Sequence, residues 1–229
     1  MPDYTSAYRT SAERVAELIE QVPDEKLTIM VPACPEWSVK DLIAHFAGVA
    51  GDVATGNLTA VGSEEWTSAQ IATRKETPVG EILEEFRTQA AQLAGAIEHL
   101  HPAIAGMMLG DLVTHEHDLR GAIGKHGERN SEGVAAATYT YVRRLGRKLR
   151  DAELPTVLVV GSSGRWPAGK GEPQATVTAA DVELLRALTG RRTEDEIRAL
   201  EWDGDPETFL PYFSAYGHPP RSLGEQGQS

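Results

Sequence analysis

The stretch PACPEWSVKDLIAHFAGVA, residues 32–50, carries the clearest structural signals in the sequence. Its two prolines disfavour a helix over the first part of the stretch. Ser38 is a favoured N-cap residue, and Asp41, three residues later, completes a carboxylate version of the capping box. Apolar residues then recur at helical spacing to about residue 55. We therefore predict a loop followed by a helix, with His45 bordering the apolar face of that helix.

Helical spacing of apolar residues extends on both sides of this stretch. It predicts further helices over about residues 5–21, 79–100, 105–123 and 132–150. Residues 56–77 are rich in Gly, Ser and Thr and are expected to form a linker, with Trp66 and Ile71 as possible contacts to the core. The first part of the chain is therefore predicted to be an all-helical bundle.

The composition changes near residue 150. Residues 156–160 form a strand-like run, 165–170 and 174–178 are candidate strands, and 181–188 and 193–200 are candidate helices. Residues 205–216 suggest a last helical piece, and the polar tail 217–229 is expected to be loose. The sequence thus predicts an α+β protein, with a helical domain over residues 1–150 and a small α/β domain over 151–229.

The chain is acidic, with 22 Lys and Arg against 34 Asp and Glu among 229 residues, a formal net charge of −12. This balance argues against nucleic acid and anionic membrane surfaces, which both require clustered positive charge. No apolar run approaches the roughly 18 residues of a membrane-spanning helix. The first residues also lack the apolar core of a signal peptide. We expect a soluble, cytoplasmic protein.

Cys34 is the single cysteine. One cysteine excludes an intramolecular disulfide framework and a Cys-rich zinc site. Any thiol chemistry must therefore use Cys34 or a thiol that arrives as a ligand. The seven histidines become the main candidates for metal binding.

Asp111 and His115 are four residues apart on a predicted helix, so their side chains lie on one face. With His45 from another helix they would form a set of two histidines and one carboxylate, which leaves positions open for substrate. A surface Asp–His pair and a half-buried histidine would give the same pattern. Asp118 has two interpretations, as an acceptor for a ligand histidine or as a surface partner of an arginine, either Arg14 or Arg120. His117 is expected to face solvent.

Three stretches resemble the mycothiol-dependent maleylpyruvate isomerase family of the DinB-like superfamily, in its actinobacterial type. They are residues 32–50, quoted above, DLVTHEHDLRGAIG at 111–124 and LLRALTGRRTEDEIRALEWDGDP at 184–206. The first resembles the family's Cys-Pro-x-Trp-Ser/Thr-Val loop, which leads into a helix that carries a metal-binding histidine. The second resembles its second metal motif. The third resembles its closing segment.

The resemblance implies a DinB-like four-helix bundle that holds a divalent metal, usually zinc, and a smaller α/β domain. It implies His45, Asp111 and His115 as metal ligands, with Asp118 behind them, and mycothiol as co-substrate. Asp111 stands where the characterised isomerases have a glutamate. Because Asp is one methylene shorter, we expect its carboxylate to reach the same ion only if the helix shifts or a water intervenes.

The implied activity is a thiol-dependent cis–trans isomerisation of a small unsaturated or electrophilic substrate. A mycothiol S-transferase is an alternative, since both reactions begin with the same metal-activated sulfur. A non-catalytic member that binds a small ligand or a partner is a third. The expected partners are small molecules only, in a monomer or homodimer.

The sequence identifies no acid–base residue for this chemistry. Arg120 is a candidate for binding a substrate carboxylate, and Arg74, Arg165 and Arg221 are further candidates. Cys34 and Trp37 are interpreted as packed loop residues. The alternatives for them are a nucleophile and a substrate platform, respectively.

Overall fold

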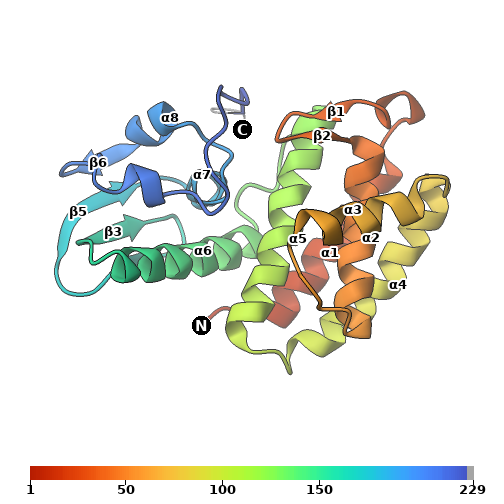
Figure 1. Cartoon of the computed structure of the whole chain (residues 1–229), viewed down its shortest axis with the longest axis horizontal. Helices are drawn as coiled ribbons and strands as arrows, with labels where there is room; N and C mark the ends of the chain where they lie inside the picture. The colour runs from red at the N-terminus through yellow and green to blue at the C-terminus, as the bar shows by residue number, and fades with distance from the viewer. Residues whose placement is uncertain (226–229) are drawn as a thin grey trace. The chain divides into compact units, whose positions relative to one another are not determined.

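The computed structural model describes residues 1–225, and the contacts within it divide the chain into two compact units (Figure 1). The first unit covers residues 3–126, and the second begins at residue 127.

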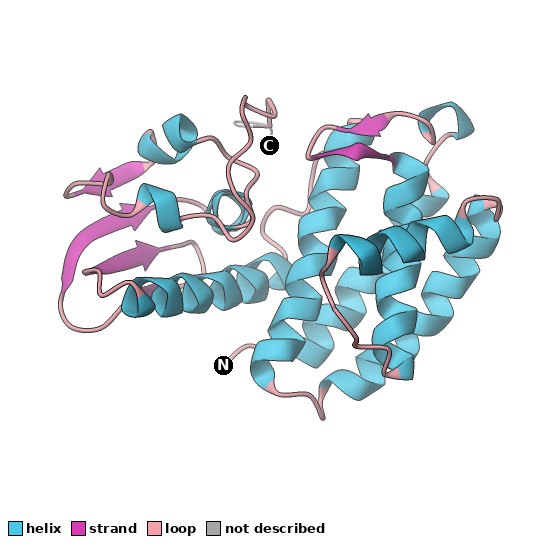
Figure 2. Ribbon diagram, in the orientation of Figure 1, coloured by secondary structure: helices cyan, strands magenta, loops and turns pink. Residues whose placement is uncertain are grey.

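The first unit is a four-helix bundle with one extra helix, as Figure 2 shows in cyan. The bundle helices are α1 (Tyr4–Glu20), α2 (Val39–Thr55), α4 (Val79–Ile97) and α5 (Pro102–Ile123). The 3₁₀ turn η1 (Asp24–Lys26) follows α1, and the extra helix α3 (Glu64–Arg74) packs on α2. This arrangement confirms the predicted DinB-like bundle.

Helix α2 begins where the sequence predicts. The Ser38 hydroxyl accepts a hydrogen bond from the Asp41 backbone N–H at 3.2 Å, and the Asp41 carboxylate accepts from the Ser38 N–H at 2.8 Å. Two short antiparallel strands, β1 (Met30–Val31) and β2 (Cys34–Ser38), precede it, where only an irregular loop was predicted. This hairpin places Cys34 and Trp37 immediately before α2.

The buried face of α2 forms the centre of the bundle. Leu42, Ile43 and Phe46 are buried, and the Phe46 ring lies 5.8 Å from that of Phe86 on α4. Burying each such side chain contributes about 1.5–3 kcal/mol to folding. The predicted apolar stripe therefore packs as expected.

Helix α3 lies within the segment that was predicted to be a linker. It begins after the N-cap Ser63, and its buried residues are Trp66 and Gln70. A helix with so short a buried stripe has no apolar period to detect in the sequence. It packs closely on α2 because Gly48 has no side chain, and a Cβ there would lie 2.5 Å from Gln70 Cβ.

The second unit is a mixed sheet with helices. Its strands are β3 (Thr156–Val160), β4 (Arg165–Ala168), β5 (Pro173–Thr178) and β6 (Glu201–Asp203), in the order β4-β3-β5-β6. Strands β3 and β5 are parallel, and the other neighbours are antiparallel. The other elements are α6 (Glu132–Asp151), α7 (Asp181–Leu188), α8 (Glu194–Arg198) and the 3₁₀ turn η2 (Leu210–Tyr212).

Helix α6 differs from its expected place. The sequence predicted it as part of a domain over residues 1–150, whereas the structure assigns it to the unit with the sheet. Its apolar stripe, which includes Tyr141 and Leu145, is buried there because α6 packs on α7 and β4. Gly146 allows a close approach, because a Cβ there would lie 3.2 Å from the Ala168 Cα. Periodicity reveals that a helix has an apolar face, and the partner of that face depends on the fold.

The tail is anchored as far as it is described. The carboxylate of Glu225 accepts hydrogen bonds from the buried side chains of Arg186, at 2.9 and 2.5 Å, and Arg192, at 3.0 Å. Buried guanidinium groups require such partners. The expected loose tail is therefore held down through residue 225, and its last part, residues 226–229, lies outside the described residues. No helix within residues 1–225 is long and apolar enough to cross a membrane.

The contact between α2 and α3 generates the first prediction. Gly48→Ala places a methyl group against Gln70, so we expect it to lower the free energy of unfolding by about 1–3 kcal/mol. The control Gly95→Ala adds the same methyl group to a helix where nothing lies within 4 Å, and it should stabilise by up to about 1 kcal/mol. Urea denaturation measures both. Equal effects of the two substitutions would contradict the packing described.

Candidate metal centre

His45 projects from α2 into the interior of the bundle, with 2% of its surface exposed. Its Nδ1 lies 2.9 Å from Oε1 of Gln70. Its Nε2 is buried and has no hydrogen-bond partner among residues 1–225. A buried polar atom without a partner is rare in folded proteins and calls for an explanation.

Asp111 and His115 face this nitrogen from α5, one helical turn apart. Asp111 Oδ2 lies 3.7 Å from His45 Nε2, and Asp111 Oδ1 lies 3.7 Å from His115 Nε2. The two imidazole rings are 5.0 Å apart in an edge-to-face arrangement. The structure thus brings together the three residues that the sequence singled out.

His115 is held in one orientation by Asp118. Its Nδ1 lies 3.0 Å from Oδ2 of Asp118, whose carboxylate is buried, so Nδ1 carries the proton and donates it. Burial lowers the pKa of His115, while Asp118 and Asp111 oppose that effect. The ring is therefore neutral at pH 7, and its Nε2 presents a lone pair to Asp111.

These donors fit a divalent metal ion. Bonds of about 2.0–2.1 Å to nitrogen and oxygen separate neighbouring tetrahedral ligands by roughly 3.3 Å, and each histidine Nε2 lies 3.7 Å from an oxygen of Asp111, Oδ2 for His45 and Oδ1 for His115. One donor atom each from His45, Asp111 and His115 lies within 4.8 Å of the other two. The Asp111 carboxylate lies between the two histidines, and the helix shift or water expected for its shorter side chain stays a prediction.

Cys34 and Trp37, from strand β2, lie beside the same rings. The Trp37 ring is 4.8 Å from that of His45 and 5.8 Å from that of His115. Cys34 Sγ lies 4.0 Å from His115 Nδ1 and 3.7 Å from Asp118 Oδ2. Cys34, His115 and Asp118 therefore form a second possible donor set, on the opposite nitrogen of the His115 ring. That nitrogen already donates to Asp118.

Arg120, the candidate for binding a substrate carboxylate, lies on another side of α5 than His115. It follows His115 by five residues, which turns it by about 140° around α5. Its Nε donates to Glu116 at 2.9 Å, and Glu116, fully buried, also accepts two hydrogen bonds from Arg14 on α1. The two arginines considered as partners of Asp118 both pair with Glu116. His117, expected to face solvent, is buried.

Sequence reasoning missed two residues beside the cluster. Gln70 contacts His45, and its Nε2 donates to Asp52 at 2.7 Å. Asp52 lies on α2, seven residues beyond His45, and Gln70 lies on the unpredicted helix α3. Neither residue belongs to a recognisable motif, so the sequence offers no signal for this pairing.

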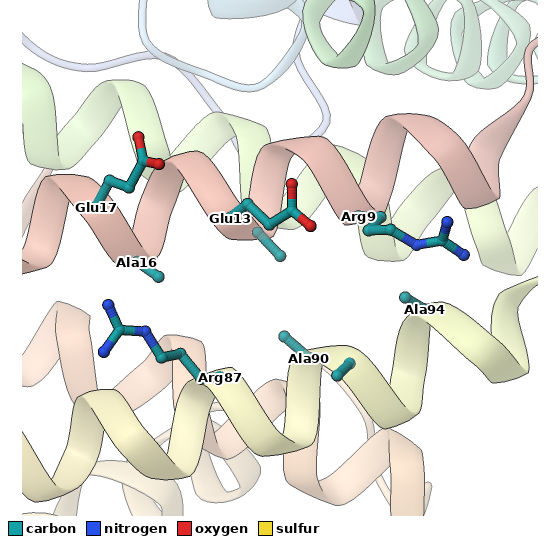
Figure 3. Close-up of a pocket in the computed structure, with 9 residues that line it drawn as sticks. Arg9, Glu13, Ala16, Glu17, Arg87, Ala90 and Ala94 are labelled. Carbon is teal, nitrogen blue, oxygen red and sulfur yellow. The ribbon is translucent and has the colours of Figure 1, made fainter.

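A separate groove of about 420 Å³ lies between α1 and α4 (Figure 3). Alanines such as Ala16 and Ala90 form its floor, while Arg9, Glu13 and Arg87 stand at its sides. It contains no residue of the His45–Asp111–His115 cluster. We assign the chemistry to the cluster because it combines converging donor atoms with a buried nitrogen, His45 Nε2, that has no hydrogen-bond partner among residues 1–225.

The helical bundle that carries this cluster is similar to known proteins. Residues 8–120 match the family model described as "Mycothiol maleylpyruvate isomerase N-terminal domain". This helical bundle belongs to the mycothiol maleylpyruvate isomerase family. None of the curated proteins compared with the chain gives a significant match.

Two solved structures share the fold of this family member. One is described as the mycothiol-dependent maleylpyruvate isomerase. It is 14% identical, with a TM-score of 0.59, and the match covers 83% of this chain and 90% of that one. The other is described as a mutant of such an isomerase with one histidine changed to alanine. It is 13% identical, with a TM-score of 0.59, and the match covers 91% and 96%.

The hydrogen bond between Arg120 and Glu116 generates the second prediction. Arg120→Ala removes a hydrogen bond to the buried Glu116 carboxylate and should lower the free energy of unfolding by about 2 kcal/mol. The control Arg87→Ala removes exposed ion pairs to Glu20 and Glu84, which should leave the unfolding midpoint nearly unchanged. Urea denaturation measures both. Native stability of Arg120→Ala would contradict the structural role.

Proposed function

We propose that this protein is a metal-dependent enzyme that uses mycothiol to isomerise a small unsaturated or electrophilic substrate. The observation that carries the proposal is the unpartnered Nε2 of His45, which faces Asp111 and His115 inside a family domain. Two imidazoles and a carboxylate form a donor set that suits zinc. The same observation disfavours a non-catalytic member with a lost metal site.

Each residue around the cluster has a defined part in this proposal. His45, Asp111 and His115 would hold the ion, which when bound supplies the positive charge that lowers the pKa of a thiol. Asp118 keeps the proton on Nδ1 of His115, so that Nε2 remains a donor. Trp37 covers one side of the imidazole rings and limits the access of water to them.

The thiol would come from mycothiol. In the proposed reaction its sulfur adds to an activated cis double bond, the resulting single bond rotates, and elimination of the sulfur gives the trans isomer. The thiol is regenerated, so substrate and product have equal mass. Cys34 takes no covalent part in this scheme, and its sulfur lies against Asp118. The proposal places the enzyme in the cytoplasm, a compartment in which thiols remain reduced.

Metal analysis tests the ligand set. We expect purified protein to bind about one equivalent of zinc, His45→Ala and His115→Ala each to abolish binding, and Cys34→Ala to retain it. The physical reason is that Cys34 lies on the Nδ1 side of His115, away from the converging Nε2 atoms. Elemental analysis after dialysis measures the content.

Two results would overturn this assignment. Loss of zinc in Cys34→Ala together with its retention in His45→Ala would move the site to the second donor set. Native protein that binds no divalent ion at all would remove the proposed function.

Product analysis separates isomerase from transferase. With mycothiol and an α,β-unsaturated cis acid, we expect a product of unchanged mass and trans geometry, because elimination completes the cycle. Mass spectrometry and proton NMR record the two properties. A stable conjugate with the mass of substrate plus thiol would instead establish the S-transferase.

A further inference from the structure

We propose that Gln70 is a positioning residue that fixes His45 in the tautomer with its proton on Nδ1. This tautomer follows from hydrogen bonds within the bundle alone. Its consequence for metal affinity rests on the proposed function.

The orientation of the Gln70 amide is fixed by Asp52. An ionised carboxylate accepts hydrogen bonds and donates none. The two Asp52 oxygens accept from different amides, Oδ2 from Gln70 Nε2 at 2.7 Å and Oδ1 from Asn57 Nδ2 at 2.8 Å. The nitrogen of the Gln70 amide therefore faces Asp52, and its oxygen faces His45.

The orientation of the amide determines the tautomer of His45. A carbonyl oxygen only accepts hydrogen bonds, so the 2.9 Å contact between Gln70 Oε1 and His45 Nδ1 requires a proton on Nδ1. The other nitrogen, Nε2, then carries the lone pair that faces Asp111. In the opposite tautomer, the lone pair of His45 Nδ1 would face a lone pair of Gln70 Oε1, and the two atoms would repel each other. The Nε2–H group would in turn be buried with no acceptor within hydrogen-bond distance among the described residues.

Gln70 itself is held firmly. It is 4% exposed, and the absence of a side chain at Gly48 lets it reach the interior beside α2. Arg74 donates to the Gln70 backbone carbonyl at 2.9 Å and pairs with Glu85 on α4. These contacts fix α3 on the bundle and leave the amide little freedom to turn.

The two histidines are thus oriented by different means. His115 donates to the carboxylate of Asp118, whereas His45 donates to a neutral amide that is itself held by Asp52. Groups that hold the second nitrogen of a ligand histidine typically change metal affinity 10–100-fold when removed. We assign this function to Gln70.

The test uses the full-length, metal-free protein labelled with ¹⁵N. Long-range proton–nitrogen correlation spectra report which nitrogen of His45 carries the proton. We expect the Nδ1–H form in the native protein and a shift towards the Nε2–H form, which free imidazole side chains prefer, in Gln70→Ala. Zinc affinity, measured by competition with a chelator, should fall about 10–100-fold in Gln70→Ala.

Two further variants separate positioning from packing. Gln89→Ala is the matched control, because Gln89 packs beside Gly51 of α2 without reaching His45. It should keep both the native tautomer and the native affinity. The double variant Asp52→Asn with Gln70→Glu exchanges the donor and the acceptor in the hydrogen bond between positions 52 and 70. The new amide at position 52 donates to the new carboxylate at position 70, which still accepts from His45, so the Nδ1–H form should return.

The possible results lead to distinct conclusions. An Nε2–H form of His45 in the native protein would overturn the inference, as would an unchanged tautomer in Gln70→Ala or a double variant that behaves like Gln70→Ala. Native protein that binds no zinc would overturn the proposed function alone. The tautomer measurement would still decide the role of Gln70.

Discussion

The start of helix α2 is the constraint on which the candidate site depends. Reciprocal hydrogen bonds between Ser38 and Asp41 fix the first turn of the helix. His45 follows Ser38 by seven residues, about two turns, so its direction is set once the helix begins. Helix α2 contacts α3, α4 and α5. A change in its starting point would therefore displace His45 from Asp111 and from Gln70 together.

Helix α2 also carries the imidazole of His45 into an apolar interior. Burying a polar group in this way costs free energy unless its polar atoms have partners. Gln70 satisfies one nitrogen of His45, and Asp118 satisfies one nitrogen of His115. The nitrogens that remain face Asp111. In the proposed site, these buried hydrogen bonds orient the two imidazole rings so that their lone pairs converge, as a preorganised metal-binding site requires.

In the second unit, two buried arginines pair with a carboxylate from the tail. Arg186 and Arg192 are both buried, and the carboxylate of Glu225 lies against both. A buried guanidinium without a partner would be strongly destabilising. Through Glu225, the tail therefore supplies the carboxylate that the two buried arginines require.

The sequence by itself determined the elements whose signals are local. Ser38 and Asp41 fixed the start of α2, Thr193 and Glu196 that of α8, and apolar spacing revealed the long helices. The resemblance of short motifs selected His45, Asp111 and His115. Only the tertiary structure decided that α6 packs on the sheet, that residues 64–74 form a helix, that Arg120 pairs with Glu116 and that Gln70 reaches His45. The packing of α6, the formation of α3 and the contact of Gln70 with His45 depend on contacts between residues far apart in the chain, and such contacts leave no period or cap in the sequence. Arg120 and Glu116 are only four residues apart on α5, but the burial of Glu116 that makes this pair structural cannot be read from their spacing.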